Sequence, residues 1–262
     1  MARCRTCGKF GLFLKVDENG ECQTCAVKSS QKRYIQVHEQ MAESEMLSLQ
    51  KAEIVLSKGK LKHRALSELN DITFSNITAK GKYDNFVVFD TETTGLSASK
   101  DKIIEIGAVR FENGKPTAVF ETLINPEMPV PADASSVNHI TDEMLTNAPT
   151  ISQVLPAFDL FVGNSPVVAH NLAFDLKFIH RAGSTLVDTK RKYYCTYEQS
   201  KRMLKGPTYR NGEITDKPYE VYDHKLETLC DYYGIYQSGK HRAAADAIAT
   251  GKLFLKLVEE KQ

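Results

Sequence analysis

Two acidic side chains stand where a buried strand is expected to end. Asp90 and Glu92 directly follow the apolar run 86–89. Alternate residues of a strand point to the same side, so the two carboxylates should project together. Adjacent carboxylates repel each other unless one is protonated or a cation bridges them, and Mg²⁺ prefers such oxygen ligands. The pair therefore indicates a metal site, with an acidic strand end exposed to solvent as the alternative.

Two further acids lie near histidines later in the chain. Asp175 follows the apolar run 166–169, and Asp246 comes five residues after His241. Five residues on a regular helix turn through about 500°, which leaves two side chains roughly 140° apart. If His241 and Asp246 act together, His241 should precede the helix and Asp246 should lie in an early turn. Taken singly, Asp175 and Asp246 are also ordinary acids of a first helical turn.

Four cysteines near the start of the chain have the spacing of a structural zinc site. They form two Cys-x-x-Cys pairs: Cys4, Cys7, Cys22 and Cys25. Two such pairs close a tetrahedral site, and a module this small has too little core to fold without a metal. Disulfides and a redox motif are the alternatives, which a reducing compartment and the matched pairs disfavour. Cys195 and Cys230 are expected to be small buried side chains.

The pattern of apolar residues predicts an α/β fold with a mixed sheet. Strands are expected at 86–89, 103–111, 118–124 and 166–169. Helices are expected at 29–57, 151–162, 172–181, 194–204, 224–233 and 243–258, with a short helical turn at 141–144. Residues 205–222, which contain Asn211-Gly212, predict a hairpin-like insertion. Three strands in a meander followed by alternating helices and a strand give a layered domain.

Composition sets limits on the class of protein. The 262 residues are 42% hydrophobic and 26% charged, which excludes a disordered or collagen-like chain. Apolar runs fall far short of the roughly 20 residues that span a bilayer, and the first residues lack the apolar segment of a secretory signal, so a cytoplasmic protein is expected. The net charge of +1 divides into +5 over residues 1–82 and −4 over residues 83–262. A basic front and an acidic back fit a polyanion partner and metal ions, with charged solvated surface as the alternative.

Taken together, the three acidic groups resemble the motifs of the DnaQ-like 3′–5′ exonucleases of the DEDD superfamily. The motifs are Asp-x-Glu at 90–92, His-Asn-x-x-x-Asp at 170–175 and His-x-Ala-x-x-Asp at 241–246, within a match of about residues 84–259. His241 places the chain in the histidine subgroup, because the tyrosine subgroup has Tyr at the position of Arg242. The resemblance implies an RNase H-like mixed β-sheet flanked by helices. The resemblance leaves out the cysteine pairs and helix 29–57, so the chain is expected to divide into a zinc module at 1–28, a helical connector at 29–82 and an exonuclease domain at 83–262.

The resemblance also implies roles for particular residues. The catalytic set is His241, Asp90, Glu92, Asp175 and Asp246. The four acids would hold two Mg²⁺ or Mn²⁺ ions, and His241 would accept the proton of the attacking water. Substrate contacts are implied at Thr93, Leu96, Asn171 and Phe174, with core packing as the alternative for Leu96 and Phe174. The chain departs from the family at Asn138-His139, where His-Gly is common, and this leaves one substrate contact open.

The function implied by the resemblance is a metal-dependent exonuclease that releases nucleoside 5′-monophosphates from the 3′ end of DNA. An exonuclease acting on RNA or oligoribonucleotides is an alternative, as is a zinc-ribbon adaptor with a secondary nuclease. Cations mixed with aromatics at 190–194, with Lys201, Arg202 and Lys205 beyond, suit a nucleic acid single strand, with a solvated basic helix face as the alternative. A protein could dock on the zinc module or on helix 29–57, and no membrane partner is expected.

Overall fold

The computed structural model describes residues 2–3, 5, 10–11, 64–210, 213–214, 218–237 and 241–262. The chain divides into two units, Met1–Leu49 and Gln50–Gln262. In the first unit, strand β1 (Ala2–Arg3) pairs antiparallel with β2 (Phe10–Gly11). The four predicted zinc cysteines and helix 29–57 lie outside the described residues. Among the described helices, none has the length and apolar character needed to cross a membrane.

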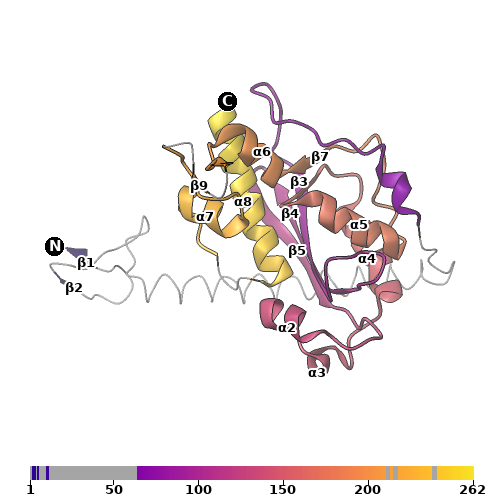
Figure 1. The fold of residues 1–262 in the computed structure, drawn as a ribbon. Coiled ribbons are helices and arrows are strands. Elements are labelled where there is room, and N and C mark those ends of the chain that lie inside the picture. Colours follow the sequence, from indigo (N-terminus) through magenta and orange to yellow (C-terminus); the bar gives the residue numbers. More distant parts are fainter. Residues whose placement is uncertain are drawn as a thin grey trace. The chain divides into compact units, whose positions relative to one another are not determined.

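The second unit is built on a mixed sheet of five strands in the order β5-β4-β3-β6-β7 (Figure 1). The strands are β3 (Phe86–Thr93), β4 (Ile103–Glu112), β5 (Lys115–Leu123), β6 (Val167–Ala169) and β7 (Tyr193–Cys195). The first three form an antiparallel meander, whereas β6 and β7 run parallel to β3. This arrangement confirms the predicted α/β class and mixed sheet.

Helices cover both faces of this sheet. They are α2 (Ala132–Asn138), α3 (Asp142–Leu145), α4 (Ile151–Val162), α5 (Leu172–Ala182), α6 (Thr196–Met203), α7 (Leu226–Tyr233) and α8 (Ala243–Lys261). Helices α4 and α5 lie on one face, and α8 lies on the other with α6 and α7 beside it (Figure 1). Side chains of β3 alternate between the two faces. Val87 and Phe89 pack with α4 and α5, whereas Phe86 and Val88 pack with α8.

Helix α8 lies unusually close to β4 because small residues meet there. A Cβ atom on Gly107 of β4 would lie 2.1 Å from the backbone nitrogen of Ala244. Further along, a Cβ on Gly251 of α8 would lie 2.3 Å from the ring of Phe111. The small side chains of Ala243 and Ala244, which open α8, allow this approach. This contact brings the start of α8 down onto the sheet.

Residues 64–85 pack on the sheet and its helices ahead of β3. The segment contains the 3₁₀ helix η1 (Leu66–Leu69) and buries Ile77 and Tyr83. The Ser75 N–H donates to the Tyr193 carbonyl at 2.7 Å, so the segment pairs with the outer edge of β7 at this point. Covering a sheet edge satisfies backbone groups that would otherwise be open to another chain. The part of the predicted connector that the structure describes is thus held against the sheet.

Most predicted elements are present, and the differences are local. Tyr194 and Cys195 were predicted as the start of a helix but belong to β7, and α6 begins at Thr196. Helix α2 lies in the proline-rich stretch where no helix was predicted. The insertion contains the expected hairpin, in which β8 (Tyr209–Arg210) pairs antiparallel with β9 (Glu213–Ile214). The side chains of Cys195 and Cys230 are both buried, as predicted.

We predict that Gly107→Ala destabilises the protein. The added methyl meets backbone rather than a mobile side chain, so α8 must shift, at a cost of about 1–3 kcal/mol. Urea unfolding followed by circular dichroism measures the change. Thr117→Ala on exposed β5 serves as the control and should stay within about 0.5 kcal/mol of the parent. Equal stability of Gly107→Ala and the parent would contradict the close packing.

Candidate active site

The end of β3 directs the first two acids toward α8. Asp90 and Glu92 continue the side of the strand that carries Phe86 and Val88. A register shift between Glu92 and Thr93 ends the regular ladder with β4 just beyond them. The two carboxylates are half-buried and project together, as the spacing predicts.

The first turn of α8 brings Asp246 to the same place. The ligand oxygens of Asp90, Glu92 and Asp246 all lie within 4.8 Å of one another. His241 precedes the helix, which begins at Ala243, so the expected placement of His241 and Asp246 is observed. The His241 N–H donates to Asp246 Oδ2 at 3.1 Å, and the Gln237 amide donates to Oδ1 at 3.4 Å. Asp246 thereby holds the loop that carries His241.

Asp175 approaches from the opposite face of the sheet. It lies in the first turn of α5 and is only 2% exposed. Its Oδ1 accepts hydrogen bonds from the Thr91 backbone N–H at 3.0 Å and from the Thr91 hydroxyl at 2.7 Å. Because Thr91 points away from Asp90 and Glu92, one strand connects acids on both of its faces. Asp175 thus lies next to the group of Asp90, Glu92 and Asp246. Its oxygens are not among those that all lie within 4.8 Å of one another.

The acids perturb one another strongly. Burial, followed by the charges of Asp175, Glu92 and Asp246, raises the pKa of Asp90 well above its usual range. Burial and the charge of Asp246 raise the pKa of Glu92 to about 8, and burial raises that of Asp175 to about 7 despite the hydrogen bonds from Thr91. Clustered carboxylates of this kind suit a divalent cation, which would relieve their repulsion. The donor set therefore fits the predicted Mg²⁺ or Mn²⁺.

Asn138 is a site residue that sequence reasoning did not assign. It is 2% exposed, its amide donates a hydrogen bond to Glu92, and its Oδ1 accepts the Ile140 N–H at 3.1 Å. The next residue, His139, has a φ of 60°, which explains why glycine is common at its place in the family. The departure noted in the sequence therefore places an amide against a carboxylate of the acid cluster.

The loop after β3 exposes an apolar side chain four residues beyond Glu92. Thr93 is buried and its hydroxyl donates to the Gly95 carbonyl at 2.6 Å. Asp101 accepts the Ser97 N–H at 2.8 Å, which closes the turn. Leu96 is 87% exposed, so the alternative of core packing is excluded for this residue. An exposed leucine held on an ordered loop is available to a ligand.

The other predicted substrate residues lie at the start of α5. Asn171 is exposed, has a φ of 61° and precedes the helix. Phe174 is half-buried and its ring lies 4.9 Å from that of Phe178, so it packs partly on the core. His170 Nδ1 and Thr196 Oγ1 form a hydrogen bond of 2.9 Å, and burial lowers the pKa of His170 to about 4. This imidazole is neutral at physiological pH and fixes the turn ahead of α5.

One residue of the basic stretch at 190–194 has a structural role. The Arg191 guanidinium donates to the carbonyls of Leu186, Ser165 and Gly163 at 3.1, 2.5 and 2.6 Å. It therefore ties loops together. Lys201 lies on α6 with its Nζ 5.0 Å from the ring centroid of Tyr197, a pairing of cation and aromatic of the predicted kind.

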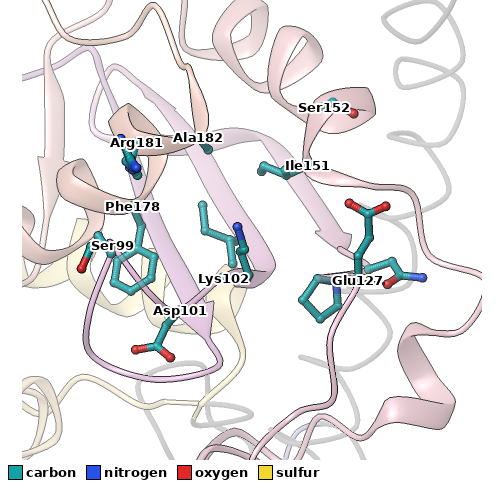
Figure 2. Close-up of a pocket in the computed structure, with 13 residues that line it drawn as sticks. Ser99, Asp101, Lys102, Glu127, Ile151, Ser152, Phe178, Arg181 and Ala182 are labelled. Atoms are coloured by element: carbon teal, nitrogen blue, oxygen red, sulfur yellow. Dashed lines mark hydrogen bonds between the residues drawn. The ribbon is translucent and has the colours of Figure 1, made fainter. Parts of the chain in front are cut away.

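A separate pocket of about 290 Å³ opens on the face that carries α4 and α5 (Figure 2). Its labelled lining comes from the loop after β3, from Glu127, and from those two helices. The charged residues of the lining are two cations and two anions, so neither charge dominates: Lys102, Arg181, Asp101 and Glu127. None of the predicted catalytic or substrate residues lines it. The clustered acids therefore lie outside this pocket.

Comparison with known families agrees with the geometry. The model of the RNase T exonuclease family matches residues 87–254, a span that includes all four acids and His241. The chain belongs to this exonuclease family. The predicted class of enzyme, a 3′–5′ exonuclease that hydrolyses phosphodiesters, is thereby confirmed.

Two relatives show how this domain is used elsewhere. DNA polymerase III PolC-type from Caldanaerobacter subterraneus is 36% identical over 178 residues, which is 68% of this chain and 12% of the relative. DNA polymerase III subunit epsilon from Treponema pallidum is 35% identical over 175 residues, which is 66% of this chain and 76% of the relative. The chain thus spans about an eighth of the PolC-type relative but three quarters of the epsilon subunit.

A solved structure has the same fold. E. coli Exonuclease I in complex with a dT13 oligonucleotide matches with a TM-score of 0.55 and 17% identity, covering 69% of this chain and 42% of that one. At this identity the likeness supports the fold, and it agrees with the predicted mixed sheet flanked by helices.

We predict that the metal-free protein loses stability as the pH rises from about 4 to 8. Glu92 and Asp175 keep their protons in the folded state up to about pH 8 and 7, whereas the unfolded chain releases them near 4.5 and 3.8. The unfolded state therefore binds fewer protons across this window, and the free energy of unfolding falls as the pH rises. Glu92→Gln should remove part of the fall and be more stable than the parent at pH 8 by about 1–3 kcal/mol.

Urea unfolding in EDTA at pH 5, 6, 7 and 8 measures this difference. Glu259→Gln on exposed α8 is the matched control and should follow the parent at every pH. A gap between Glu92→Gln and the parent that does not grow with pH would contradict the prediction.

Proposed function

We propose that the protein removes nucleotides one at a time from the 3′ end of single-stranded DNA. The observation that carries this proposal is the convergence of Asp90, Glu92 and Asp246 at one edge of the sheet, with Asp175 adjoining them. The DNA substrate is supported by the relatives, which are named as DNA polymerase III chains, and by the oligonucleotide bound to Exonuclease I. Products would be nucleoside 5′-monophosphates.

The four acids are proposed to hold two Mg²⁺ or Mn²⁺ ions. When bound, such ions lower the pKa of a water molecule and stabilise negative charge on the phosphate. Asp90 is central in this arrangement, because its pKa responds to the charges of all three other acids. Asn138 orients the Glu92 carboxylate by donating its amide hydrogen bond.

His241 is proposed to accept the proton of the attacking water. It is exposed at the entrance to α8, and its backbone is fixed by the hydrogen bond to Asp246. Histidine is the side chain that most often accepts a proton in general base catalysis. Exposure allows the ring to reach a substrate and to release the proton to solvent.

The remaining predicted contacts would hold the strand end. The backbone at Glu92 and Thr93 is proposed to bind the terminal 3′-OH. Leu96, exposed on its closed turn, would pack against the terminal base. Asn171 and the accessible part of Phe174 would line the path of the strand, where base stacking on an aromatic ring tolerates any sequence.

We predict that Asp90→Asn loses almost all activity and still folds. Loss of one metal ligand should remove about 4 kcal/mol of transition-state stabilisation, or about a thousandfold in rate. The measurement uses a 5′-labelled DNA single strand and an RNA strand of the same sequence, each with Mg²⁺ and with EDTA. A descending ladder from DNA in Mg²⁺ alone supports the proposal. Degradation of the RNA strand alone would favour the alternative of an exonuclease that acts on oligoribonucleotides. Internal cleavage would contradict an exonuclease.

We predict that His241→Ala lowers kcat by about 10²- to 10⁴-fold and removes the acidic limb of the pH–rate profile. The limb reflects protonation of the imidazole, which stops it from accepting a proton. His139→Ala is the matched control, since this histidine lies near the site without an assigned role in proton transfer. An unchanged rate and profile for His241→Ala would remove it from the mechanism.

We propose further that residues 1–28 form a structural zinc module joined by the connector 29–82 to the exonuclease domain 83–262. The spacing of Cys4, Cys7, Cys22 and Cys25 supports four thiolate ligands, which leave no open position for catalysis. The module or helix 29–57 would offer a surface for a protein partner.

Zinc content tests this module. Atomic emission of the purified parent should give about one zinc per chain, and Cys22→Ser should lose it because three thiolates bind far more weakly. Cys230→Ala, a buried cysteine of the other unit, should retain the zinc. Equal zinc in the parent and Cys22→Ser would contradict the site. Activity on a short oligonucleotide should not change, since the zinc is assigned no catalytic role.

A further inference from the structure

A fifth carboxylate lies beside the acid cluster and is completely buried. Glu105 is on β4 with 0% exposure, among apolar neighbours. A buried charge is tolerated when it is paired and hydrogen-bonded. Glu105 Oε1 accepts from Arg242 Nη2 at 2.6 Å and from Nε at 3.0 Å, and Oε2 accepts the Ala243 N–H at 2.9 Å. Both oxygens therefore engage the two residues that lead into α8.

The register of the sheet places Glu105 directly across from a metal-binding residue. Glu92 pairs with Glu105, and Asp90 pairs with Gly107. Residues opposite each other in an antiparallel pair share one face of the sheet. Glu105 thus lies on the α8 side with the acids, and its charge adds to the forces that raise the pKa of both Asp90 and Glu92.

The bonding of Glu105 distinguishes an anchor from a metal ligand. The described side chains whose ligand atoms come together are Asp90, Glu92 and Asp246, without Glu105. Its oxygens are occupied by Arg242 and Ala243. Arg242 Nη2 also lies 3.9 Å from Oε1 of Glu121 on β5, so the guanidinium lies near carboxylates of two strands. Glu105 therefore binds the entrance of α8 through the arginine.

That entrance carries both residues that α8 supplies to the site. Arg242 stands between His241 and the helix, and its carbonyl accepts the Asp246 N–H at 3.0 Å. On the other side of Arg242, the alanines contact Gly107 of β4 without space for a Cβ. The ion pair and this close contact fix the first turn of α8 on the strand that pairs with β3.

We propose that Glu105 and Arg242 are a positioning pair: their ion pair holds the start of α8 so that Asp246 and His241 keep their places beside Asp90 and Glu92. This inference rests on the proposed exonuclease function. Arg242 has a second effect, because it compensates the charge of Glu105 next to a cluster that already repels itself. Neither residue is assigned contact with substrate or metal.

The proposal predicts a specific pattern of defects. In Arg242→Ala the entrance of α8 loosens and Glu105 is left uncompensated, so divalent cations should bind about 10- to 100-fold more weakly. At fixed Mg²⁺ kcat should fall by a similar factor, and a higher Mg²⁺ concentration should restore part of it. The KM for DNA should stay within about twofold of the parent. Arg242→Lys keeps the charge but loses the planar guanidinium group. Its cation affinity and kcat should lie between those of the parent and those of Arg242→Ala.

Isothermal titration with Mn²⁺ at pH 8 measures the binding step without any turnover. Steady-state kinetics on a labelled single strand gives kcat, KM and the Mg²⁺ requirement. Arg110→Ala is the matched control. Arg110 is a half-buried arginine on β4, the strand that carries Glu105, and it donates to the Phe161 carbonyl at 2.6 Å, away from the acids. It should alter thermal stability and leave Mn²⁺ affinity and kcat unchanged.

Several outcomes would overturn the proposal. Parent-like Mn²⁺ affinity and kcat in Arg242→Ala would show that the pair positions nothing. A raised KM with unchanged kcat would make Arg242 a phosphate contact instead. Loss of Mn²⁺ binding in Glu105→Gln but not in Arg242→Ala would make Glu105 a metal ligand. If Arg242→Ala does not fold, Arg242→Lys and Glu105→Gln carry the test, and both should weaken Mn²⁺ binding. If the parent does not degrade DNA, the proposed function fails while the Mn²⁺ comparison still decides the role of the pair.

Discussion

Repulsion among carboxylates at the end of β3 is the constraint on which the domain depends. Burial and mutual charge raise the pKa of Asp90, Glu92 and Asp175, so the fold holds these groups where they are least stable as anions. The cost is offset by a strand whose first four residues are fully buried between two helical layers. A core of that size can support a site that opposes its own folding, and such strain is typical of functional sites.

One strand serves the site through both of its faces. Asp90 and Glu92 point toward α8, whereas Thr91, between them, points toward α5 and binds Asp175 through two hydrogen bonds. Asp175 of α5 and Asp246 of α8 are therefore both positioned next to the same three residues of β3, 90–92. Any displacement of β3 moves the whole group together, which preserves the relative positions of the acids better than three independent loops would.

The sequence predicts the parts of this site that follow from local geometry. Strand alternation is sufficient to pair Asp90 with Glu92, and helical rotation is sufficient to place His241 ahead of α8. Glu105 was missed, because a single acid in an apolar strand indicates nothing until the register sets it opposite Glu92. Helix α2 was missed among prolines, and β7 was taken for helix because three residues are too few to show a period. The zinc cysteines lie outside the described residues, so that prediction stands on spacing alone.

The location of the chemistry follows from charge rather than from the size of a hollow. The pocket in Figure 2 is lined by cations and anions in balance and contains none of the acids that perturb one another. The three clustered acids are instead half-buried. Exposed His241 is bonded through its backbone to Asp246, and exposed Leu96 follows Glu92 by four residues. An enzyme that acts on the end of a polymer has to leave room for the rest of the chain, whereas an enclosed cavity admits only small molecules. Acids grouped at an accessible strand end leave that room, which is why charge rather than cavity size locates the candidate site.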